Sequence, residues 1–208
     1  MSDLILLRHG ETAGCSSIRF YGSTDIELSE LGIEQMRRAG EALKDMIFGS
    51  VYASPLKRSR DSAYIVMNGR KPEPVVIEDF REIDFGQWEG LSITEIAERD
   101  PAGFRAWKEN GLLFSRFPGG DAKAEFYRRI TMAAKNVFNH IEYPALGVLH
   151  KDVIRGIISA LVNIPITELA YHPVELGSIH RLSQFHDGWK LISTNETSHL
   201  GECRIEHS

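Results

Sequence analysis

The sequence predicts an α/β fold, a three-layer sandwich with a mostly parallel central sheet and helices on both faces. Short apolar runs of strand length alternate along the chain with longer stretches whose apolar residues recur at helical spacing. Strands that alternate with helices in this way form a parallel sheet that is covered on both sides. Two further runs near the C-terminus are separated by a short turn at residues 186–188, and we expect these strands to lie antiparallel at an edge.

The first two predicted elements are a buried strand and an amphipathic helix. Residues 4–7 are four consecutive apolar residues, which is typical of a strand that is buried on both faces. A loop of small and polar residues over 13–28 follows. Ser29 is a suitable N-cap for a helix whose apolar positions continue to Ile47, and Gly49 ends that helix.

A second strand and a second helix come next. Residues 51–53 are predicted as the strand, and Ser54 with Pro55 is expected to start the helix through a capping hydroxyl and a proline at the first helical position. Gly69 ends this helix. Residues 75–77 form a third apolar run and are predicted as a strand.

The second half of the chain repeats the alternation. An irregular segment over 80–90 leads into two short predicted helices and a turn. The long helix that follows has one buried stripe, and the next helix is expected to be capped by Asp152. The remaining predicted elements are helices at 92–99, 101–109 and 121–140, a turn at 117–120, and strands at 145–149, 178–182 and 189–193.

Composition favours a single soluble domain spanning residues 1–208. The chain has 42% hydrophobic and 25% charged residues, which are ordinary proportions for a globular protein, and it contains no repeat or linker. The two cysteines, Cys15 and Cys203, lack metal-type spacing and indicate a reduced compartment. Because no signal peptide or transmembrane stretch is apparent, we expect a cytoplasmic protein, either a monomer or a homodimer, with no membrane partner.

A formal net charge of -5 argues against a nucleic-acid partner, which usually requires a basic face. An anionic ligand must therefore be held by a local group of cations. Arg8 and His9 follow the first strand, Arg58 falls in the first turn after the second strand, and His150 follows the fourth. The carboxyl ends of parallel strands share one edge of the sheet, where helix N-termini add positive dipole ends.

Each of these residues also has an ordinary structural interpretation. Arg58 could be a solvated first-turn residue, and His150 a hydrogen-bonded core residue. Glu82 and Glu89 could be surface carboxylates in a loop. Their joint occurrence at the ends of consecutive strands favours an oxyanion site instead. A metal site built on the histidines is disfavoured because neighbouring arginines repel a divalent cation and no close ligand pair is present.

Several motifs in order resemble the histidine phosphatase superfamily, which has the phosphoglycerate-mutase-like fold. Residues 8–12 (RHGET) resemble its RHG motif, and residues 54–59 (SPLKRS) are similar to its second arginine motif. Residues 82–90 (EIDFGQWEG) resemble the acid-bearing segment, and residues 148–155 are similar to the second-histidine motif. Residues 118–121 and 195–200 also fit, so the resemblance extends over essentially the whole chain.

The resemblance implies a phosphatase that uses no metal and no cofactor. His9 would be the nucleophile that takes the phosphoryl group, and Arg8, Arg58 and His150 would hold the phosphate. Glu82 would be the general acid and then the general base. These residue types suit the chemistry, since guanidinium groups match phosphate oxygens and a neutral imidazole can attack phosphorus.

The predicted substrate-binding residues are Cys15, Tyr21, Gly22 and Lys151. Cys15 stands where the family commonly has asparagine, and cysteine is a weaker hydrogen-bonding group. Lys151 and Asp152 stand where the family often has glycines or similarly small residues. The Lys151 side chain is therefore expected to narrow the entrance or to bind a second anionic group of the substrate.

The resemblance is greatest to the alpha-ribazole phosphatase branch, through the Glu82–Glu89 segment and the closing segment. The expected substrate is a small-molecule phosphate monoester. Fructose-2,6-bisphosphate, sugar phosphates and protein phosphohistidine remain open as substrates. Because the chain lacks the longer capping segments of the mutases, we expect water to receive the phosphoryl group. The alternatives are a phosphoglycerate-mutase-type transferase and a non-catalytic protein that binds a phosphorylated ligand.

Overall fold

The computed structural model describes residues 2–110, 116–139, 141–169 and 171–205. Its centre is a six-stranded sheet with the strand order β3-β2-β4-β1-β5-β6. The strands are β1 (Ser2–Arg8), β2 (Ser50–Ala53), β3 (Val75–Val76), β4 (Ala145–Leu149), β5 (Ile179–Phe185) and β6 (Gly188–Glu196). The main helices are α1 (Glu30–Ala42), α2 (Lys57–Met67), α3 (Ile93–Arg99), α4 (Pro101–Asn110), α5 (Lys123–Phe138), α6 (Lys151–Val162) and α7 (Ile166–Leu169).

The strand pairing confirms the predicted mixed sheet. β4 pairs in parallel with β1 on one side and with β2 on the other, and β2 pairs in parallel with β3. β5 and β6 run antiparallel at the opposite edge. Because β1, β2 and β4 lie side by side and point the same way, the residues that follow them meet at one edge of the sheet.

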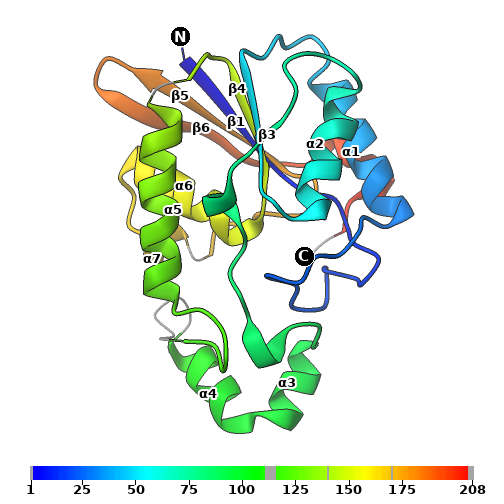
Figure 1. Cartoon of the computed structure of the whole chain (residues 1–208), viewed down its shortest axis with the longest axis vertical. Helices are drawn as coiled ribbons and strands as arrows, with labels where there is room; N and C mark the ends of the chain where they lie inside the picture. The colour runs from blue at the N-terminus through cyan, green and yellow to red at the C-terminus, as the bar shows by residue number, and fades with distance from the viewer. Residues whose placement is uncertain (1, 111–115, 140, 170, 206–208) are drawn as a thin grey trace.

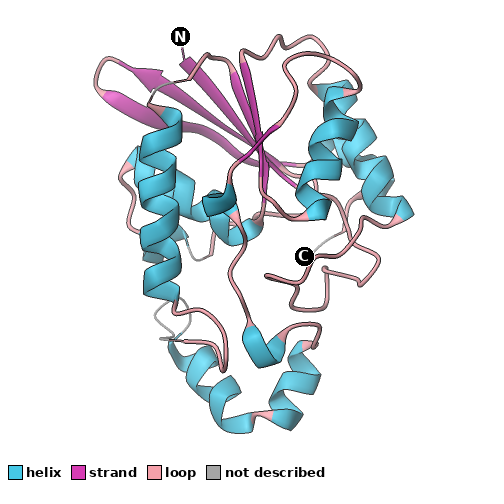
Figure 2. Cartoon of the chain, in the orientation of Figure 1, coloured by secondary structure: helices cyan, strands magenta, loops and turns pink. Residues whose placement is uncertain are grey.

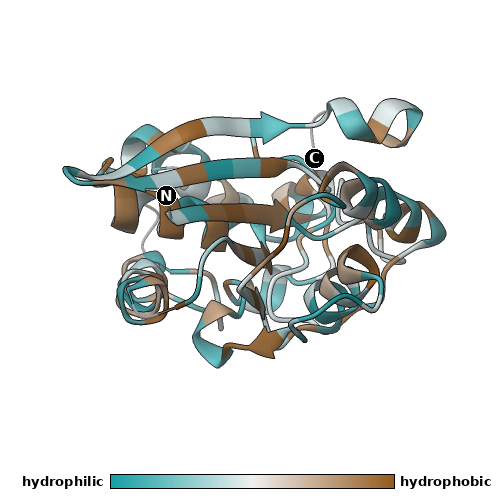
Figure 3. Cartoon of the chain, turned by 90° about the horizontal axis from the view of Figure 1, so that it is seen from above, coloured by the Kyte–Doolittle hydropathy of each residue, from teal (hydrophilic) through white to brown (hydrophobic). Residues whose placement is uncertain are grey.

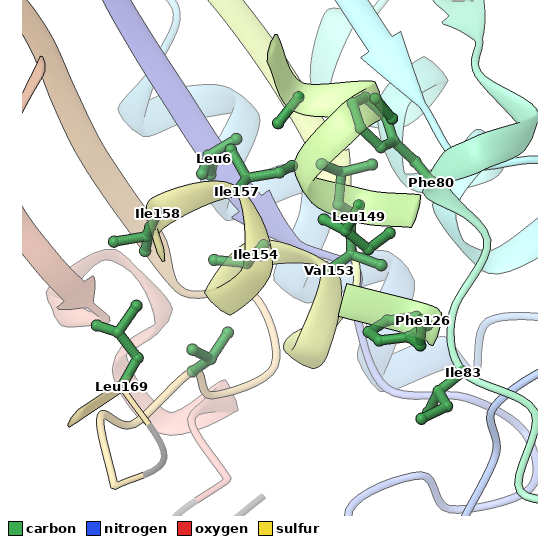
Figure 4. Close-up of a cluster of buried hydrophobic side chains, with 14 of the residues drawn as sticks. Leu6, Phe80, Ile83, Phe126, Leu149, Val153, Ile154, Ile157, Ile158 and Leu169 are labelled. Atoms are coloured by element: carbon green, nitrogen blue, oxygen red, sulfur yellow. The ribbon is translucent and has the colours of Figure 1, made fainter. Parts of the chain in front are cut away.

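Helices cover both faces of the sheet, as the sequence predicts (Figures 1 and 2). Alternate side chains of β1 enter the two layers, because successive residues of a strand point to opposite faces. Leu4 and Leu6 belong to the larger core, beneath α5 and α6. Figure 4 shows Leu6 beside Ile157 in that core. Ile5 and Leu7 belong to the smaller core, beneath α1 and α2. Figure 3 shows the strand that begins at the N-terminus turning from hydrophilic to hydrophobic colours.

The helices α3 and α4 lie beyond the carboxyl ends of the parallel strands (Figure 1). α3 begins with a capping box, in which the Ser92 hydroxyl accepts from the Glu95 amide and the Glu95 carboxylate accepts from the Ser92 amide. The aromatic rings of Trp88 and Trp107 meet edge to face, with centroids 6.1 Å apart. This contact attaches the α3–α4 unit to the segment that carries Glu82 and Glu89.

Three predicted helix boundaries are wrong. The helix α1 ends at Ala42 and does not continue to Ile47, which is 86% exposed. The chain turns after α1 and buries Phe48 in place of Ile47. α2 begins at Lys57 with no side-chain cap. The Ser54 hydroxyl accepts from the Leu56 amide and contacts His150 instead.

The third wrong boundary is that of α6, which begins at Lys151, with His150 and not Asp152 at the N-cap. The strand β4 ends at Leu149, so one residue turns the chain from strand to helix. The predicted 121–140 helix is observed as Lys123–Phe138, and its predicted last residue lies outside the described part. No helix among the described residues is long and apolar enough to cross a membrane.

Candidate active site

A cavity of about 820 Å³ opens at the carboxyl edge of the parallel strands. Arg8 and His9 from the end of β1 and Glu82 form one part of its wall, and Lys151 and Asp152 from the start of α6 form another. Its outer wall is apolar and aromatic, and includes Ile18, Phe20, Phe85, Ile93, Trp107 and Phe117. The cavity thus joins a polar, charged floor to an apolar wall that comes partly from the α3–α4 unit.

His9 has one ring nitrogen fixed as a donor. Its Nδ1 lies 2.7 Å from the carbonyl oxygen of Gly10, which can only accept, so Nδ1 carries the proton. Burial, followed by the charges of Arg58 and Arg8, lowers the pKa of His9 well below its usual value. The ring is therefore neutral, and its Nε2 carries a lone pair. The Nε–H of Arg58 donates to that Nε2 over 3.3 Å.

Arg58 is fully buried, and the loop over residues 21–24 holds it in place. Its Nη1 donates to the carbonyl of Thr24 at 2.8 Å. Its Nη2 donates to the carbonyls of Tyr21 at 3.3 Å and Gly22 at 2.7 Å. Burial lowers its pKa to about 10, which leaves the guanidinium charged at neutral pH. Arg58 is thus a fixed cation beside His9.

Glu89 orders the loop that holds Arg58. Its carboxylate accepts hydrogen bonds from the backbone amides of residues 22–24, from the hydroxyl of Thr24 and from the amide of Phe85. These hydrogen bonds fix the positions of residues 22–24 against the segment that carries Glu89. Gly22 is required here, because a Cβ at this position would lie 1.8 Å from the carbonyl oxygen of Ile83.

His150 is a buried imidazole beside His9. Its Nε2 lies 2.7 Å from the Ser54 hydroxyl, and that hydroxyl accepts from the Leu56 amide at 3.2 Å. That hydroxyl can donate to Nε2 or accept from it, depending on the tautomer of the ring. The other ring nitrogen of His150, Nδ1, is buried and has no hydrogen-bond partner among the described residues. The rings of His9 and His150 lie close, with centroids 5.0 Å apart.

Arg8 is buried at the end of β1. Its Nη1 donates to the carbonyl of Val174 over 2.6 Å. Burial lowers its pKa to about 10, and the nearby Glu82 and Glu11 carboxylates act in the opposite direction. Like Arg58, it remains a cation at neutral pH. Two permanent charges therefore flank the neutral imidazole of His9.

Glu82 is a buried carboxyl group with a raised pKa. Burial, and secondly the charge of Asp152, raises the pKa of Glu82 to about 7. One of its oxygens accepts from the Ile83 amide at 2.9 Å, and the other from the Asp152 amide at 3.2 Å. The latter amide belongs to the first turn of α6. The group is positioned by two backbone donors and exchanges a proton near neutral pH.

The four predicted substrate-binding residues lie in different environments. Tyr21 and Lys151 line the cavity. Cys15 is exposed, has a left-handed backbone (φ 61°), and is not among the residues that line the cavity. Gly22 is buried and acts through its backbone, with its amide bonded to Glu89 and its carbonyl to Arg58.

The structure adds polar residues that sequence reasoning missed. Lys123 from the start of α5 and Arg155 from the second turn of α6 line the same cavity. Asp152 accepts from Tyr127 and Arg155 at 3.3 and 3.2 Å. Arg155 follows Lys151 by four residues in the sequence, a spacing that places them on one helix face. Lys123 had no comparable sequence signal. Among the described residues, no group of three or more His, Cys, Asp or Glu side chains is arranged to hold a metal.

Comparison with known proteins identifies the family. A family model described as the histidine phosphatase superfamily (branch 1) matches residues 4–197. The chain belongs to this superfamily. The matched region reaches all six strands of the described sheet and includes the polar groups around His9. The predicted family resemblance is thereby confirmed.

Several known proteins resemble the chain over nearly its whole length. The chain is 37% identical to the phosphatase PhoE of Bacillus subtilis, over 96% of this chain and 97% of that protein. It is 28% identical to phosphoserine phosphatase 1 of Hydrogenobacter thermophilus, over 99% and 98% respectively. The crystal structure of the alpha-ribazole phosphatase from Shigella flexneri superposes with a TM-score of 0.83 at 25% identity, covering 93% of this chain and 96% of that one.

Proposed function

We propose that this protein is a metal-independent phosphatase that hydrolyses a small-molecule phosphate monoester through a phosphohistidine on His9. The observation that carries the proposal is the tautomer of His9. Its Nδ1–H is bound to the Gly10 carbonyl, so Nε2 carries a lone pair, which faces the Nε–H of Arg58. A neutral imidazole with a fixed tautomer, buried between two cations, is suited to attack a phosphate group.

In the first step, Nε2 of His9 forms a bond to phosphorus as the bond between phosphorus and the ester oxygen breaks. The protonated carboxyl group of Glu82 gives its proton to the departing alkoxide, which leaves as an alcohol. In the second step, the Glu82 carboxylate takes a proton from water as the water oxygen attacks phosphorus. The N–P bond then breaks and inorganic phosphate is released. Glu82 ends as it began, protonated, and its pKa of about 7 suits both roles.

Arg8, Arg58 and His150 would stabilise the charge that spreads over the phosphoryl oxygens. The two guanidinium groups are permanent cations, and their donors are positioned before the substrate binds. The buried Nδ1 of His150, which has no hydrogen-bond partner among the described residues, would donate to one phosphoryl oxygen in the tautomer that carries its proton there. A buried polar nitrogen without a partner is costly, and a bond to a phosphate oxygen would remove that cost.

A more specific substrate, alpha-ribazole 5′-phosphate, is supported by the apolar side of the cavity. Phe20, Phe85, Trp107 and Phe117 line it, and their rings form a connected set of edge-to-face contacts. An aromatic ring attached to a ribose phosphate would pack there with its phosphate at His9. The similarity to the Shigella flexneri alpha-ribazole phosphatase supports the same substrate.

The test is phosphate release in the presence of a chelator. The substrates are p-nitrophenyl phosphate, alpha-ribazole 5′-phosphate, phosphoserine and a set of sugar phosphates. Wild-type protein should release phosphate, and His9→Ala should not. His186→Ala, in an exposed turn between β5 and β6, is the matched control and should retain activity. Acid-labile ³²P on the wild-type protein, absent from His9→Ala, would identify the phosphohistidine.

Four results would contradict the proposal. Turnover that survives in His9→Ala would exclude His9 as the nucleophile. Activity that is lost with chelator and restored by a divalent cation would contradict metal independence. Phosphoryl transfer between phosphoglycerates in place of hydrolysis would identify a mutase, and tight binding of phosphate esters without any turnover would identify a binding protein.

A further inference from the structure

The turn over residues 174–178, which precedes β5, holds Arg8 at three points. The backbone amide of Arg8 donates to the carbonyl of Ser178 at 3.1 Å. The backbone carbonyl of Arg8 accepts from the amide of Gly177 at 3.2 Å. The third point is the side chain, because Nη1 of Arg8 donates to the carbonyl of Val174 at 2.6 Å. The position of this turn therefore determines the position of the Arg8 guanidinium.

Two residues from later in the chain hold the turn through Glu175, its second residue, which is buried. The Glu175 amide donates to Oδ1 of Asn195 at 2.8 Å, and the Glu175 carboxylate accepts from Nδ2 of Asn195 at 3.0 Å. Arg204 donates to the same carboxylate from Nε at 2.8 Å and from Nη2 at 3.0 Å. Paired bonds from an arginine to a carboxylate are strong and directional. These three residues form the Glu175 cluster.

An irregularity in β6 aims Asn195 at the turn. The register of β5 against β6 shifts between Ile179 and Arg181, so β6 carries an extra residue there, as in a β-bulge. Asn195 lies in this stretch with a left-handed backbone (φ 52°), which asparagine adopts more readily than most residues. Bulges beside active sites commonly redirect a side chain. Asn195 also begins the closing segment that resembles the family, and the bulge gives its side chain a specific contact.

We propose that Glu175, Asn195 and Arg204 are positioning residues, which hold the Arg8 guanidinium where charge develops on the transferring phosphoryl group. This inference rests on the proposed phosphatase function and extends it to three described residues that lie outside the cavity wall. If the Glu175 cluster is broken, the Val174 carbonyl shifts and Arg8 rotates with it. A misplacement of about 1 Å caused by a distant substitution can cost on the order of 10²-fold in rate.

The test compares the binding of two ligands, vanadate and inorganic phosphate. Vanadate adopts a five-coordinate geometry like that of the transition state, whereas inorganic phosphate is the tetrahedral product. Calorimetry measures the affinity for each ligand without turnover. A misplaced Arg8 should weaken the binding of vanadate more than that of phosphate, because its donors are needed most where charge develops. The ratio of the two affinities therefore reports the position of Arg8, whereas the melting temperature reports the stability of the fold.

Two substitutions of Asn195 break the cluster in different ways. Asn195→Gly removes both side-chain bonds to Glu175 and tolerates the left-handed backbone. Asn195→Asp places a second carboxylate against that of Glu175. Each should lower the ratio of vanadate to phosphate affinity, and kcat on p-nitrophenyl phosphate, about ten-fold. Adding Glu175→Gln to Asn195→Asp exchanges the amide and the carboxylate between the two positions. An N–H then faces a carboxylate oxygen again, so the double variant should recover most of the loss.

Glu196→Gln is the matched control. The Glu196 carboxylate pairs with Arg181 at 3.1 Å and ties β6 to β5, so its loss should lower the melting temperature and leave the affinity ratio unchanged. A wild-type ratio in both Asn195 variants would overturn the positioning role, and so would an equal fall of the ratio in Glu196→Gln. The proposed function is tested separately, by wild-type hydrolysis of p-nitrophenyl phosphate. Hydrolysis together with unchanged ratios would retain the phosphatase and remove the role of the Glu175 cluster.

Discussion

The Nε of Arg58 lies 3.3 Å from the Nε2 of His9, and both side chains are buried. The donor of a permanent cation therefore already points to the lone pair of the proposed nucleophile. A phosphoryl group bound at Nε2 would receive this N–H through one of its oxygens. The arrangement requires no movement of charge at the moment of reaction, which is the physical basis of electrostatic preorganisation.

Arg58→Lys should lower kcat/KM about 10²- to 10³-fold, as removal of a preorganised donor does in other enzymes. A lysine keeps the charge but loses the planar fork that bonds at once to His9, Gly22 and Thr24. Steady-state kinetics on p-nitrophenyl phosphate measure the change. Arg60→Lys, two residues further along α2, serves as the control and should have a small effect. Comparable losses in the two variants would contradict a specific role for Arg58.

The rate of hydrolysis of alkyl phosphates should fall as the pH rises through about 7, because Glu82 must carry a proton to protonate the alkoxide. The pKa of Glu82 is raised, so the acid form predominates below this value. p-Nitrophenol leaves readily without a proton, so its ester should show a flatter profile over the same range. Profiles of kcat/KM for both substrates from pH 5 to 9 make the comparison. Parallel profiles would rule Glu82 out as the proton donor to the leaving group.

Glu82→Gln should lower activity on alkyl phosphates but raise stability at alkaline pH. Glu82 binds its proton more tightly when folded, since its pKa rises from 4.5 to about 7. Its contribution to folding is therefore most favourable below pH 4.5 and is lost as the pH rises to 7. Glutamine does not ionise, so the variant avoids this loss, on the order of 1–3 kcal/mol. Melting temperatures at pH 5 and pH 8 should show a larger gain at pH 8, and an equal difference would contradict the raised pKa.

Much of the fold could be predicted because the sequence pattern and the local structure agree. Four apolar residues in β1 divide between two cores, and the Ser29 hydroxyl caps α1 through the Gly32 amide as its sequence position predicts. Boundaries failed where a tertiary contact outweighed a local signal. Ser54 looks like a helix cap, yet its hydroxyl is engaged by His150, which comes 96 residues later.

In the candidate site, too, some residues could be predicted from local sequence and others depend on tertiary contacts. Arg8, His9 and His150 could be located from strand ends alone, because parallel strands bring their carboxyl ends together. The roles of Glu82 and Glu89 could not be separated by composition, since both carboxylates lie in one irregular segment. Their environments separate them: Glu82 has two backbone donors and a raised pKa, whereas Glu89 is surrounded by amides. Lys123 lies on α5, 28 residues before Lys151 in the sequence. The packing of α5 against α6 brings Lys123 to the cavity.

Glu89→Gln should reduce activity by loosening the loop that holds Arg58. The Glu89 carboxylate accepts from four backbone amides and one hydroxyl, and a glutamine side chain would turn an NH₂ group toward some of these donors. Donors left unsatisfied cost about 1–3 kcal/mol each. The loop carbonyls that hold Arg58 would then shift. We expect about a ten-fold or larger fall in kcat and a lower melting temperature.

A double-substitution cycle separates positioning from general destabilisation. If Glu89 acts through Arg58, Glu89→Gln should cost much less activity in an Arg58→Ala background than in the wild type, because the guanidinium to be positioned is already absent. Glu95→Gln is the matched control. This carboxylate caps α3 and pairs with Arg19, so its loss should lower stability without coupling to Arg58. If the losses of activity from the Glu89 and Arg58 substitutions were additive, Glu89 would contribute only to the stability of the fold. The loop would then have no part in placing the Arg58 guanidinium beside His9.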